Sequence, residues 1–323
     1  MGRIRIYDAA EVEELLDYPG CIKAMRWAMA ALSSGERPQP LRQIWPVADG
    51  EVWGIMPGEL AALSTFGAKL ISVFHEPDGS GRTRHQGVVV AYDGSTGAVS
   101  AIADAEPITK IRTACATAAA TDVLARPGAE VLAIFGTGLQ AESHLHAVPL
   151  VRDFREILLW GQSLERARSL AERMSRETGR QITAVADGED AAGRADVICT
   201  VSSSAEPILL NEWVRDGTHI NLVGSSVLGP VEVDPPLVAR SRYVADYRAG
   251  VIAQGAELAA AREAGLVDDS HVIAEIGELF VGRVQAREND EQVTIYKSLG
   301  HVAQDLAAVT YLHKRASHQL IHN

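Results

Sequence analysis

The sequence has 323 residues, which is long enough for two domains with separate hydrophobic cores. Hydrophobic residues make up 47% of it and charged residues 22%, a balance ordinary for a globular protein, and no run approaches the length of a membrane-spanning helix. The net charge of −12 disfavours binding to a phosphate backbone, so we expect neither a nucleic-acid partner nor a membrane.

The cysteines and the N-terminus bear on the cellular compartment. Cys21, Cys115 and Cys199 lie far apart, and no pair has the spacing of metal ligands. A sparse, odd number of cysteines in a large chain favours a reducing compartment, and we interpret all three as structural thiols. The opening residues lack the hydrophobic segment of a signal peptide. We therefore expect a cytoplasmic protein without a metal site.

The first third of the chain predicts two helices followed by a sheet. Apolar residues recur every three to four positions from Asp8 to Ser34, and Pro19-Gly20 is expected to divide this helical pattern. Turn residues such as "EPDGSG" and "YDGSTG" then separate short β-rich runs, which indicates mixed or antiparallel strands. The expected strands lie in "EVWGIMP", "GAKLISVF", "GVVVAYD" and "GAVSAIAD".

The middle of the chain predicts a doubly wound parallel sheet. The Ala-rich segment "ITKIRTACATAAATDVLARPG" reads as one long helix that ends before Pro127-Gly128. Strands then alternate with helices, notably Leu139–Leu150 and Leu164–Glu177, which is typical of an α/β fold. The expected strands are Val131–Phe135, Ile157–Trp160, Ile182–Val185, Val197–Val201, Ile220–Val223 and Tyr243–Ala245.

The tail is helical from about Gly300, and we expect its apolar face to pack back on the first domain. A Rossmann-type sheet, residues 119–299, is therefore predicted as an insertion into a smaller α+β domain. That smaller domain comprises residues 1–118 and is completed by residues 300–323.

A glycine turn between an expected strand and an expected helix predicts a dinucleotide site. It has the pattern G-x-G-x-x-A. The first glycine permits a tight turn, the second lets the backbone approach a pyrophosphate, and the alanine permits close packing of helix on strand. Without this context the pattern is only a glycine-bearing turn. The residues expected to contact the cofactor here are Gly136, Thr137, Gly138, Leu139 and Gln140.

The end of the next expected strand bears on the choice between NAD and NADP. No acidic residue stands there to accept a hydrogen bond from a ribose hydroxyl. The alternative for the nearby arginines is a solvated helix face. We favour NADP(H) and leave NAD(H) open, on the residues Gly161, Gln162, Ser163, Arg166 and Arg168.

The long helix together with the glycine turn, "ITKIRTACATAAATDVLARPGAEVLAIFGTGLQAESHL", resembles the ornithine cyclodeaminase/mu-crystallin family. Further matching pieces follow in the family's order: "GAKLISVF", "RHQGVVVAYDGSTGAVSAIAD", "ADVICTVSSSAEPIL", "GTHINLVGSS" and "YKSLGHVAQDLAA". The resemblance implies a homodimer with a Rossmann domain and a domain for substrate and dimerisation. It also implies hydride transfer between a nicotinamide and the α-carbon of an amino or imino acid.

The resemblance implies a cationic site for the substrate carboxylate, formed by Arg42, Lys69 and Arg112. Taken alone, Arg42 reads as a surface salt bridge and Lys69 as a residue at a strand edge whose charge reaches solvent. Arg112 is harder to explain that way, because it begins an apolar helix. The resemblance also places His85 in the pocket, although a lone histidine is more often structural.

Three further residues are implied at the cofactor. The hydroxyl of Thr113 is expected near a cofactor phosphate, and Ser298 and Leu299 of "YKSLG" near the nicotinamide. Three acidic residues outside these motifs are interpreted as solvated helix faces: Glu257, Glu275 and Glu278.

One departure from the family pattern bears on the reaction. Ornithine cyclodeaminases have an aspartate in the loop "HINLVGSSVLGPVEV", where this chain has Ser226. Serine is a poor base at neutral pH, but it can hydrogen-bond to an imine. We therefore expect an NAD(P)H-dependent reductase of imino acids, and we leave open the reverse reaction of an amino-acid dehydrogenase. The alternatives are an ornithine cyclodeaminase and a binding protein whose NADPH only shapes a ligand pocket.

Overall fold

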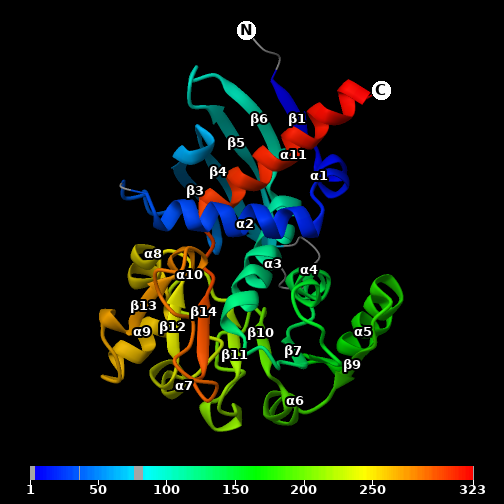
Figure 1. The fold of residues 1–323 in the computed structure, drawn as a ribbon, viewed down its shortest axis with the longest axis vertical. Coiled ribbons are helices and arrows are strands. Elements are labelled where there is room, and N and C mark those ends of the chain that lie inside the picture. Colours follow the sequence, from blue (N-terminus) through cyan, green and yellow to red (C-terminus); the bar gives the residue numbers. More distant parts are fainter. Residues whose placement is uncertain (1–3, 36, 76–82, 323) are drawn as a thin grey trace. The chain divides into compact units, whose positions relative to one another are not determined.

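The computed structural model describes residues 4–35, 37–75 and 83–322 of the chain (Figure 1). The chain forms two compact units, one of Met1–Arg112 with His301–Asn323 and the other of Thr113–Gly300. The boundary falls inside helix α3 (Ala105–Leu124). The finer division at residues 118/119 and 299/300 stays a prediction. The expected "EPDGSG" turn lies outside the described residues.

The first unit contains a six-stranded mixed sheet with the order β1-β6-β5-β4-β3-β2. Strand β1 pairs in parallel with β6, and the other pairs are antiparallel. Its strands are β1 (Arg5–Tyr7), β2 (Gln43–Ala48), β3 (Glu51–Leu60), β4 (Thr65–His75), β5 (Thr83–Asp93) and β6 (Val99–Asp104). Its other helices are α1 (Ala9–Leu15), α2 (Tyr18–Ser33), η1 (Ala61–Leu63) and α11 (Val302–His322).

Helix α11 packs on α2 and across strands β3 to β5, so the tail returns to the first unit as its apolar face requires (Figure 1). Two glycines mark the close approach of this helix. A Cβ on Gly67 would come within 3.1 Å of Leu306 Cδ2, and one on Gly58 within 2.5 Å of Val302 Cγ1. The helix therefore covers the sheet face to which Gly67 and, two residues on, Lys69 belong.

Two details of the first unit differ from the sequence analysis. The break between α1 and α2 falls at Leu16 and Asp17, and Pro19 lies in the first turn of α2. Proline is tolerated there because the first N–H groups of a helix have no partner within the helix. The sequence analysis does not predict β1 or β2. Strand β2 contains Pro46 and lies at the sheet edge, where a missing N–H is harmless.

The second unit contains an eight-stranded parallel sheet with the order β13-β12-β14-β11-β10-β7-β8-β9. Its strands are β7 (Val131–Phe135), β8 (Glu156–Trp160), β9 (Ile182–Val185), β10 (Val197–Thr200), β11 (His219–Leu222), β12 (Arg242–Ala245), β13 (Val272–Glu275) and β14 (Thr294–Lys297). Its helices are α4 (Leu139–Ala147), η2 (Val148–Leu150), α5 (Leu164–Thr178), α6 (Gly188–Arg194), η3 (Asn211–Trp213), α7 (Pro235–Arg240), α8 (Arg248–Gln254), α9 (Ala256–Glu263), η4 (Asp269–His271) and α10 (Ile276–Phe280).

The doubly wound parallel sheet is confirmed. The order of β9-β8-β7-β10-β11 reverses direction between β7 and β10, and this is the point where ligands bind in folds of this type. The six expected strands occur, with ends that differ by at most one residue. Strands β13 and β14 are not predicted by the sequence analysis.

Candidate functional site

In the first unit, two cations share one buried carboxylate. Lys69 of β4, Arg112 of α3 and Asp305 of α11 are at most 3% exposed. Oδ1 of Asp305 accepts from Lys69 Nζ at 3.3 Å and from Arg112 Nε at 3.0 Å. Arg112 Nη1 donates to Gln304 Oε1 at 2.6 Å, and Lys69 Nζ lies 3.4 Å from Thr109 Oγ1. We call Lys69, Arg112 and Asp305 the cationic cluster.

The electrostatics of the cationic cluster follow from burial and from an excess of positive charge. Burial lowers the pKa of Lys69 to about 8; the carboxylate of Asp305 opposes this, and the charges of Arg112 and Arg42 add to it. Burial also lowers the pKa of His301 to about 4, so this histidine is neutral at pH 7. Two cations and one anion leave a net charge of +1, while Asp305 Oδ2 is buried without a hydrogen-bond partner among the described residues.

The other two residues predicted to contact the substrate are more exposed to solvent than the cationic cluster. Arg42 precedes β2, is partly exposed, and is close enough for its charge to act on Lys69. His85 of β5 is exposed. It pairs with Val73, so it lies on the same sheet face as Lys69. Desolvation of its ring and then the charge of Lys69 lower its pKa. Its role in a pocket stays a prediction.

In the second unit, the glycine turn follows β7 and opens α4. Gly136 has φ of +141°, and a Cβ there would lie 2.8 Å from the backbone oxygen of Val201 at the end of β10. The protein itself therefore requires this glycine. Gly138 is different: its φ is −95°, and a Cβ there would meet nothing within 4 Å. The fold alone permits a side chain at Gly138, so the open space fits a group that approaches the backbone.

Other features of the turn also fit a dinucleotide. Gly138 is the N-cap of α4 and provides no side-chain cap, so the first N–H groups of the helix are open to an anion. Thr137 and Gln140 are partly exposed and Leu139 is 55% exposed. The buried oxygen Oε1 of Gln140 has no hydrogen-bond partner within the described structure, and such an oxygen can accept from a ribose hydroxyl.

The end of β8 carries the residues predicted to select the cofactor. Ser163 is the N-cap of α5 and accepts from the backbone nitrogen of Arg166 at 3.3 Å, so part of its role is structural. Gln162, Arg166 and Arg168 are exposed. The structure thus leaves the arginines available to a phosphate, and this role stays a prediction.

The remaining predicted residues lie at helix α3 and at the carboxyl ends of β11 and β14. Thr113 is 6% exposed in α3. Ser298 follows β14, and its buried hydroxyl lacks a hydrogen-bond partner in the described part of the chain. Leu299 is 8% exposed, and Ser226, in the loop after β11, is partly exposed. The backbone nitrogen of Ser298 donates to Leu222 at 3.0 Å, which ties these two strand ends together.

The interpretation of three glutamates as solvated helix faces is wrong. Glu257 is fully buried, and its Oε2 lies 2.6 Å from Nζ of the equally buried Lys297. Glu275 and Glu278 form a capping box at the start of α10. The sequence alone places Glu257 in an Ala-rich helix, and this composition gives no sign of a buried partner forty residues later.

The sequence analysis misses several buried acids, among them Asp305 and Glu232. Asp305 lies inside the segment "YKSLGHVAQDLAA", where only its position on the covered face of α11 could have identified it. Glu232 lies in a loop segment before α7 and is fully buried. From the sequence, a single acidic residue between two valines gives no indication that four hydrogen-bond donors converge on its side chain.

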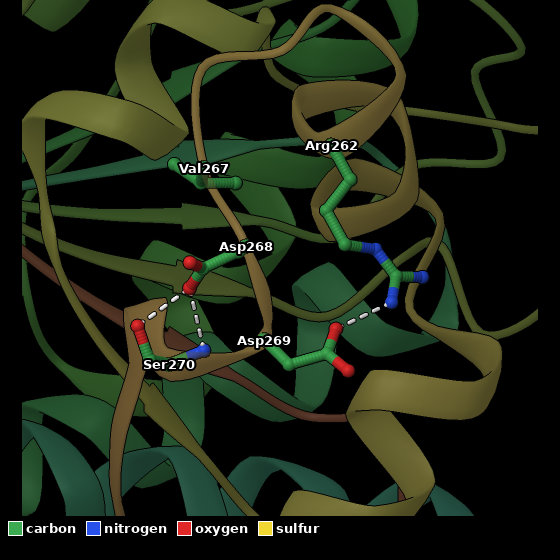
Figure 2. Close-up of a pocket in the computed structure, with 5 residues that line it drawn as sticks. All are labelled: Arg262, Val267, Asp268, Asp269 and Ser270. Carbon is green, nitrogen blue, oxygen red and sulfur yellow. Dashed lines mark hydrogen bonds and ion pairs between the residues drawn. The ribbon is translucent and has the colours of Figure 1, made fainter.

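A surface depression elsewhere in the second unit does not resemble a binding site (Figure 2). Its polar groups are already paired with one another: Arg262 with Asp269 at 2.6 Å, and Ser270 with Asp268. Among the residues that the structure describes, no three His, Cys, Asp or Glu side chains are grouped to hold a metal ion. None of the helices in these same residues is both long and apolar enough to cross a bilayer.

Comparison with known proteins gives consistent results. The model of the ornithine cyclodeaminase/mu-crystallin family matches residues 4–319. The chain is 33% identical to the ketimine reductase mu-crystallin of Mus musculus over 271 residues, which are 84% of this chain and 82% of that one.

Two solved structures are similar over 98% of this chain. One is Delta(1)-pyrroline-2-carboxylate reductase of Thermococcus litoralis with NADH and L-proline, with a TM-score of 0.92, 28% identity and 98% of that chain covered. The other is an archaeal alanine dehydrogenase dimer with bound NAD, with a TM-score of 0.89, 26% identity and 97% of that chain covered.

Proposed function

Because this chain belongs to the ornithine cyclodeaminase/mu-crystallin family, we propose that it reduces small imino acids to amino acids with a nicotinamide cofactor. Similar proteins support this: one is a ketimine reductase, and another is a pyrroline-carboxylate reductase whose structure holds NADH and L-proline. The reaction adds a hydride to the carbon and a proton to the nitrogen of a C=N bond, so the electrons come from the reduced cofactor and the proton from the site.

The observation that carries the proposal is the uncompensated charge of the cationic cluster. Lys69 and Arg112 are buried with one shared carboxylate, and a buried excess charge is costly unless a ligand compensates it. The carboxylate of an imino acid supplies one negative charge and accepts hydrogen bonds from a guanidinium. Asp305 acts through the two cations and is a positioning residue. Arg42 adds a third, more exposed cation for the same carboxylate.

The glycine turn after β7 and the residues at the strand ends would hold the cofactor, which supplies the hydride when bound. The first N–H groups of α4 would bind its pyrophosphate, while Thr113 and the free hydroxyl of Ser298 would hydrogen-bond to it. Lys69 has a pKa of about 8, so it is mostly protonated at pH 7 and can keep a nearby imine nitrogen protonated. Ser226, in place of an acid, favours reduction of a preformed imine over deamination of ornithine.

We propose NADP(H) as the preferred cofactor. No acidic residue stands among Gly161, Gln162 and Ser163, and Arg166 is exposed nearby to pair with a 2′-phosphate. The relatives with bound NADH or NAD leave this choice to measurement. Arg166→Gln should lower kcat/KM for NADPH about tenfold and leave that for NADH unchanged, with Arg176→Gln, at an exposed position in the last turn of the same helix, as the control.

Turnover tests the proposal directly. NADPH and NADH oxidation would be followed with pyrroline-2-carboxylate, piperideine-2-carboxylate, and 2-oxo acids plus an amine. We expect oxidation that Arg112→Ala and Lys69→Ala abolish. Proline and ammonia from ornithine and NAD, with no imine reduction, would instead establish the cyclodeaminase. Tight NADPH binding with silence in both assays would establish the binding-protein alternative.

We also propose a homodimer formed by the outer face of the first sheet. Strand register places apolar side chains on the face opposite Lys69, and five of them are 39–64% exposed. Trp45 stacks on Trp53 and Phe66 on Tyr92, so the face is apolar and aromatic and is suited to a second copy. The five are Ile6, Trp45, Trp53, Phe66 and Phe74. Sedimentation of Phe66→Asp should show a monomer; an unchanged dimer would contradict this interface.

A further inference from the structure

Glu232 connects the two loops at the carboxyl ends of β10 and β11. Its Oε1 accepts from the backbone nitrogen of Ser202 at 2.7 Å and from Ser202 Oγ at 2.8 Å. Its Oε2 accepts from Thr200 Oγ1 at 2.7 Å and from the backbone nitrogen of Gly224 at 2.8 Å. Four donors therefore converge on one fully buried carboxylate.

This carboxylate is itself rigidly placed. The backbone oxygen of Glu232 accepts from Ile208 at 2.9 Å and from Leu209 at 3.1 Å, and the next residue, Val233, forms a parallel bridge with Leu209. A Cβ on Gly224 would lie 2.0 Å from the backbone oxygen of Ser202 and 2.5 Å from Glu232 Oε1. The two loops and the acid thus leave no room for a side chain at Gly224.

A second buried group holds the same loop from its other side. Lys297 Nζ donates to the backbone oxygen of Ser225 at 2.6 Å, and Ser225 Oγ donates to the backbone oxygen of Pro230 at 2.6 Å. Both residues that precede Ser226 are therefore fixed. On the other loop, Ser202 follows Val201, and the backbone oxygen of Val201 would lie 2.8 Å from a Cβ on Gly136 of the glycine turn.

We propose that Glu232 is a positioning residue that fixes the two strand-end loops of the cofactor edge, one behind Gly136 and one carrying Ser226. This inference rests on the proposed function only for its kinetic consequence. Glu232 acts through the backbones of Ser202 and Gly224. A substitution can remove the acceptor, Glu232, or one of its side-chain donors, Thr200 and Ser202.

The chemistry of the carboxylate explains why glutamine cannot replace it. Each oxygen accepts from one backbone N–H, and the amide of glutamine offers only one oxygen. Whichever way the amide turns, its NH₂ group meets a backbone N–H, so one loop must move. Burial raises the pKa of Glu232, while the hydrogen bonds from Ser202 and Thr200 and the charge of Lys297 oppose the rise.

The matched control is Asp196, a buried carboxylate at the opposite edge of the same sheet. Its Oδ2 accepts from the backbone nitrogens of Glu130 and Val131 at 2.8 and 3.0 Å, and its Oδ1 pairs with Arg126 and Arg215. Asp196→Asn therefore removes the same kind of acceptor, with a similar number of donors, away from the carboxyl ends of the strands.

The test compares Glu232→Gln with Asp196→Asn. Glu232→Gln should lower kcat about 10²-fold and weaken NAD(P)H binding, measured by cofactor fluorescence, while KM for the imine stays within about twofold. In the cofactor-free protein, the amides of Ser202 and Gly224 should exchange hydrogen faster. Asp196→Asn should lower the melting temperature without these changes.

Equal losses of stability in both variants, with unchanged kcat, cofactor affinity and amide exchange in Glu232→Gln, would overturn the proposal. Should Glu232→Gln fail to fold, Thr200→Val and Ser202→Ala each remove one donor and should give smaller losses of kcat in the same direction; unchanged kcat in both would overturn it. A wild-type protein without imine turnover would refute the proposed function alone, because cofactor affinity and amide exchange still test Glu232.

Discussion

Each unit of the protein buries a cluster of charged groups. Cations outnumber carboxylates in the cluster of the first unit, and carboxylates outnumber cations in the cluster of the second. In the first unit, Lys69 and Arg112 share the single carboxylate of Asp305. In the second unit, the single ammonium of Lys297 pairs with Glu257 and acts on the nearby charge of Glu232. Excess positive charge in one place and excess negative charge in the other call for different partners.

The difference lies in what neutralises each excess. The carboxylate of Glu232 accepts hydrogen bonds from backbone and hydroxyl groups of its own unit, so its charge is already solvated by the protein. Among the described residues, the ammonium of Lys69 donates to Asp305 at 3.3 Å and makes a longer contact of 3.4 Å with Thr109. The fold thus supplies Glu232 with its hydrogen-bond donors internally, whereas the cationic cluster keeps an excess positive charge that, in our proposal, an external anion compensates. We therefore propose the cationic cluster, rather than the surroundings of Glu232, as the place where a ligand binds.

The largest expected effect is the difference in stability between variants of the two buried lysines. Lys297→Met leaves Glu257 buried without its cation and should lower the free energy of unfolding by about 3–5 kcal/mol. Lys69→Met leaves Asp305 still paired with Arg112, so its cost should be about 1 kcal/mol or less. Urea unfolding of both variants checks this. Equal losses would show that the cationic cluster is as much a structural element as its counterpart.

Arg112→Met should have the next largest effect, on catalysis. It removes the buried guanidinium that we propose for the substrate carboxylate, which should lower kcat/KM for imines about 10²–10³-fold. Lys110→Met, two residues earlier on the same helix, removes an ammonium that lies 3.6 Å from Glu13 and should leave kcat/KM within about twofold. Similar losses in both variants would indicate a general effect of charge rather than a bound carboxylate.

The sequence predicts the repeating and motif-bearing parts of this architecture, and it fails where contacts are distant. The alternation from Val131 onward determines the parallel sheet, and the glycine turn lies where its pattern predicts. Lys69 and Arg112 are found through resemblance, but the pairing of both with Asp305 joins residues about two hundred positions apart. No local pattern encodes such a pairing. Glu257 is misread for the same reason, because its partner belongs to a strand that is itself unpredicted.

The pH dependence of ligand binding tests the charge of the cationic cluster. Burial lowers the pKa of Lys69 from 10.5 to about 8, so its charge is lost as pH rises through 8. Affinity for a carboxylate inhibitor with no titrating group should therefore fall above pH 8, approaching about tenfold per pH unit.

The contribution of Lys69 to stability should change in the opposite direction. The unfolded chain keeps the proton up to pH 10.5, so the cost of burying the charge is full below pH 8 and declines between 8 and 10.5.

Lys69→Arg stays protonated and should abolish the decline in inhibitor affinity. An unchanged decline in that variant would assign the titration to another group.

The smallest expected effect distinguishes a glycine required by the fold from one required by a ligand, in line with the contrast between the two clusters. Gly138→Ala meets open space at an ordinary φ, so the melting temperature should not change, whereas the dissociation constant of NAD(P)H should rise about tenfold as the methyl group meets the cofactor. Gly136→Ala places a methyl group against Val201 at a φ of +141° and should destabilise the apo protein by about 1–3 kcal/mol. Unchanged cofactor affinity in Gly138→Ala would mean that the open space at this turn is not where the pyrophosphate binds.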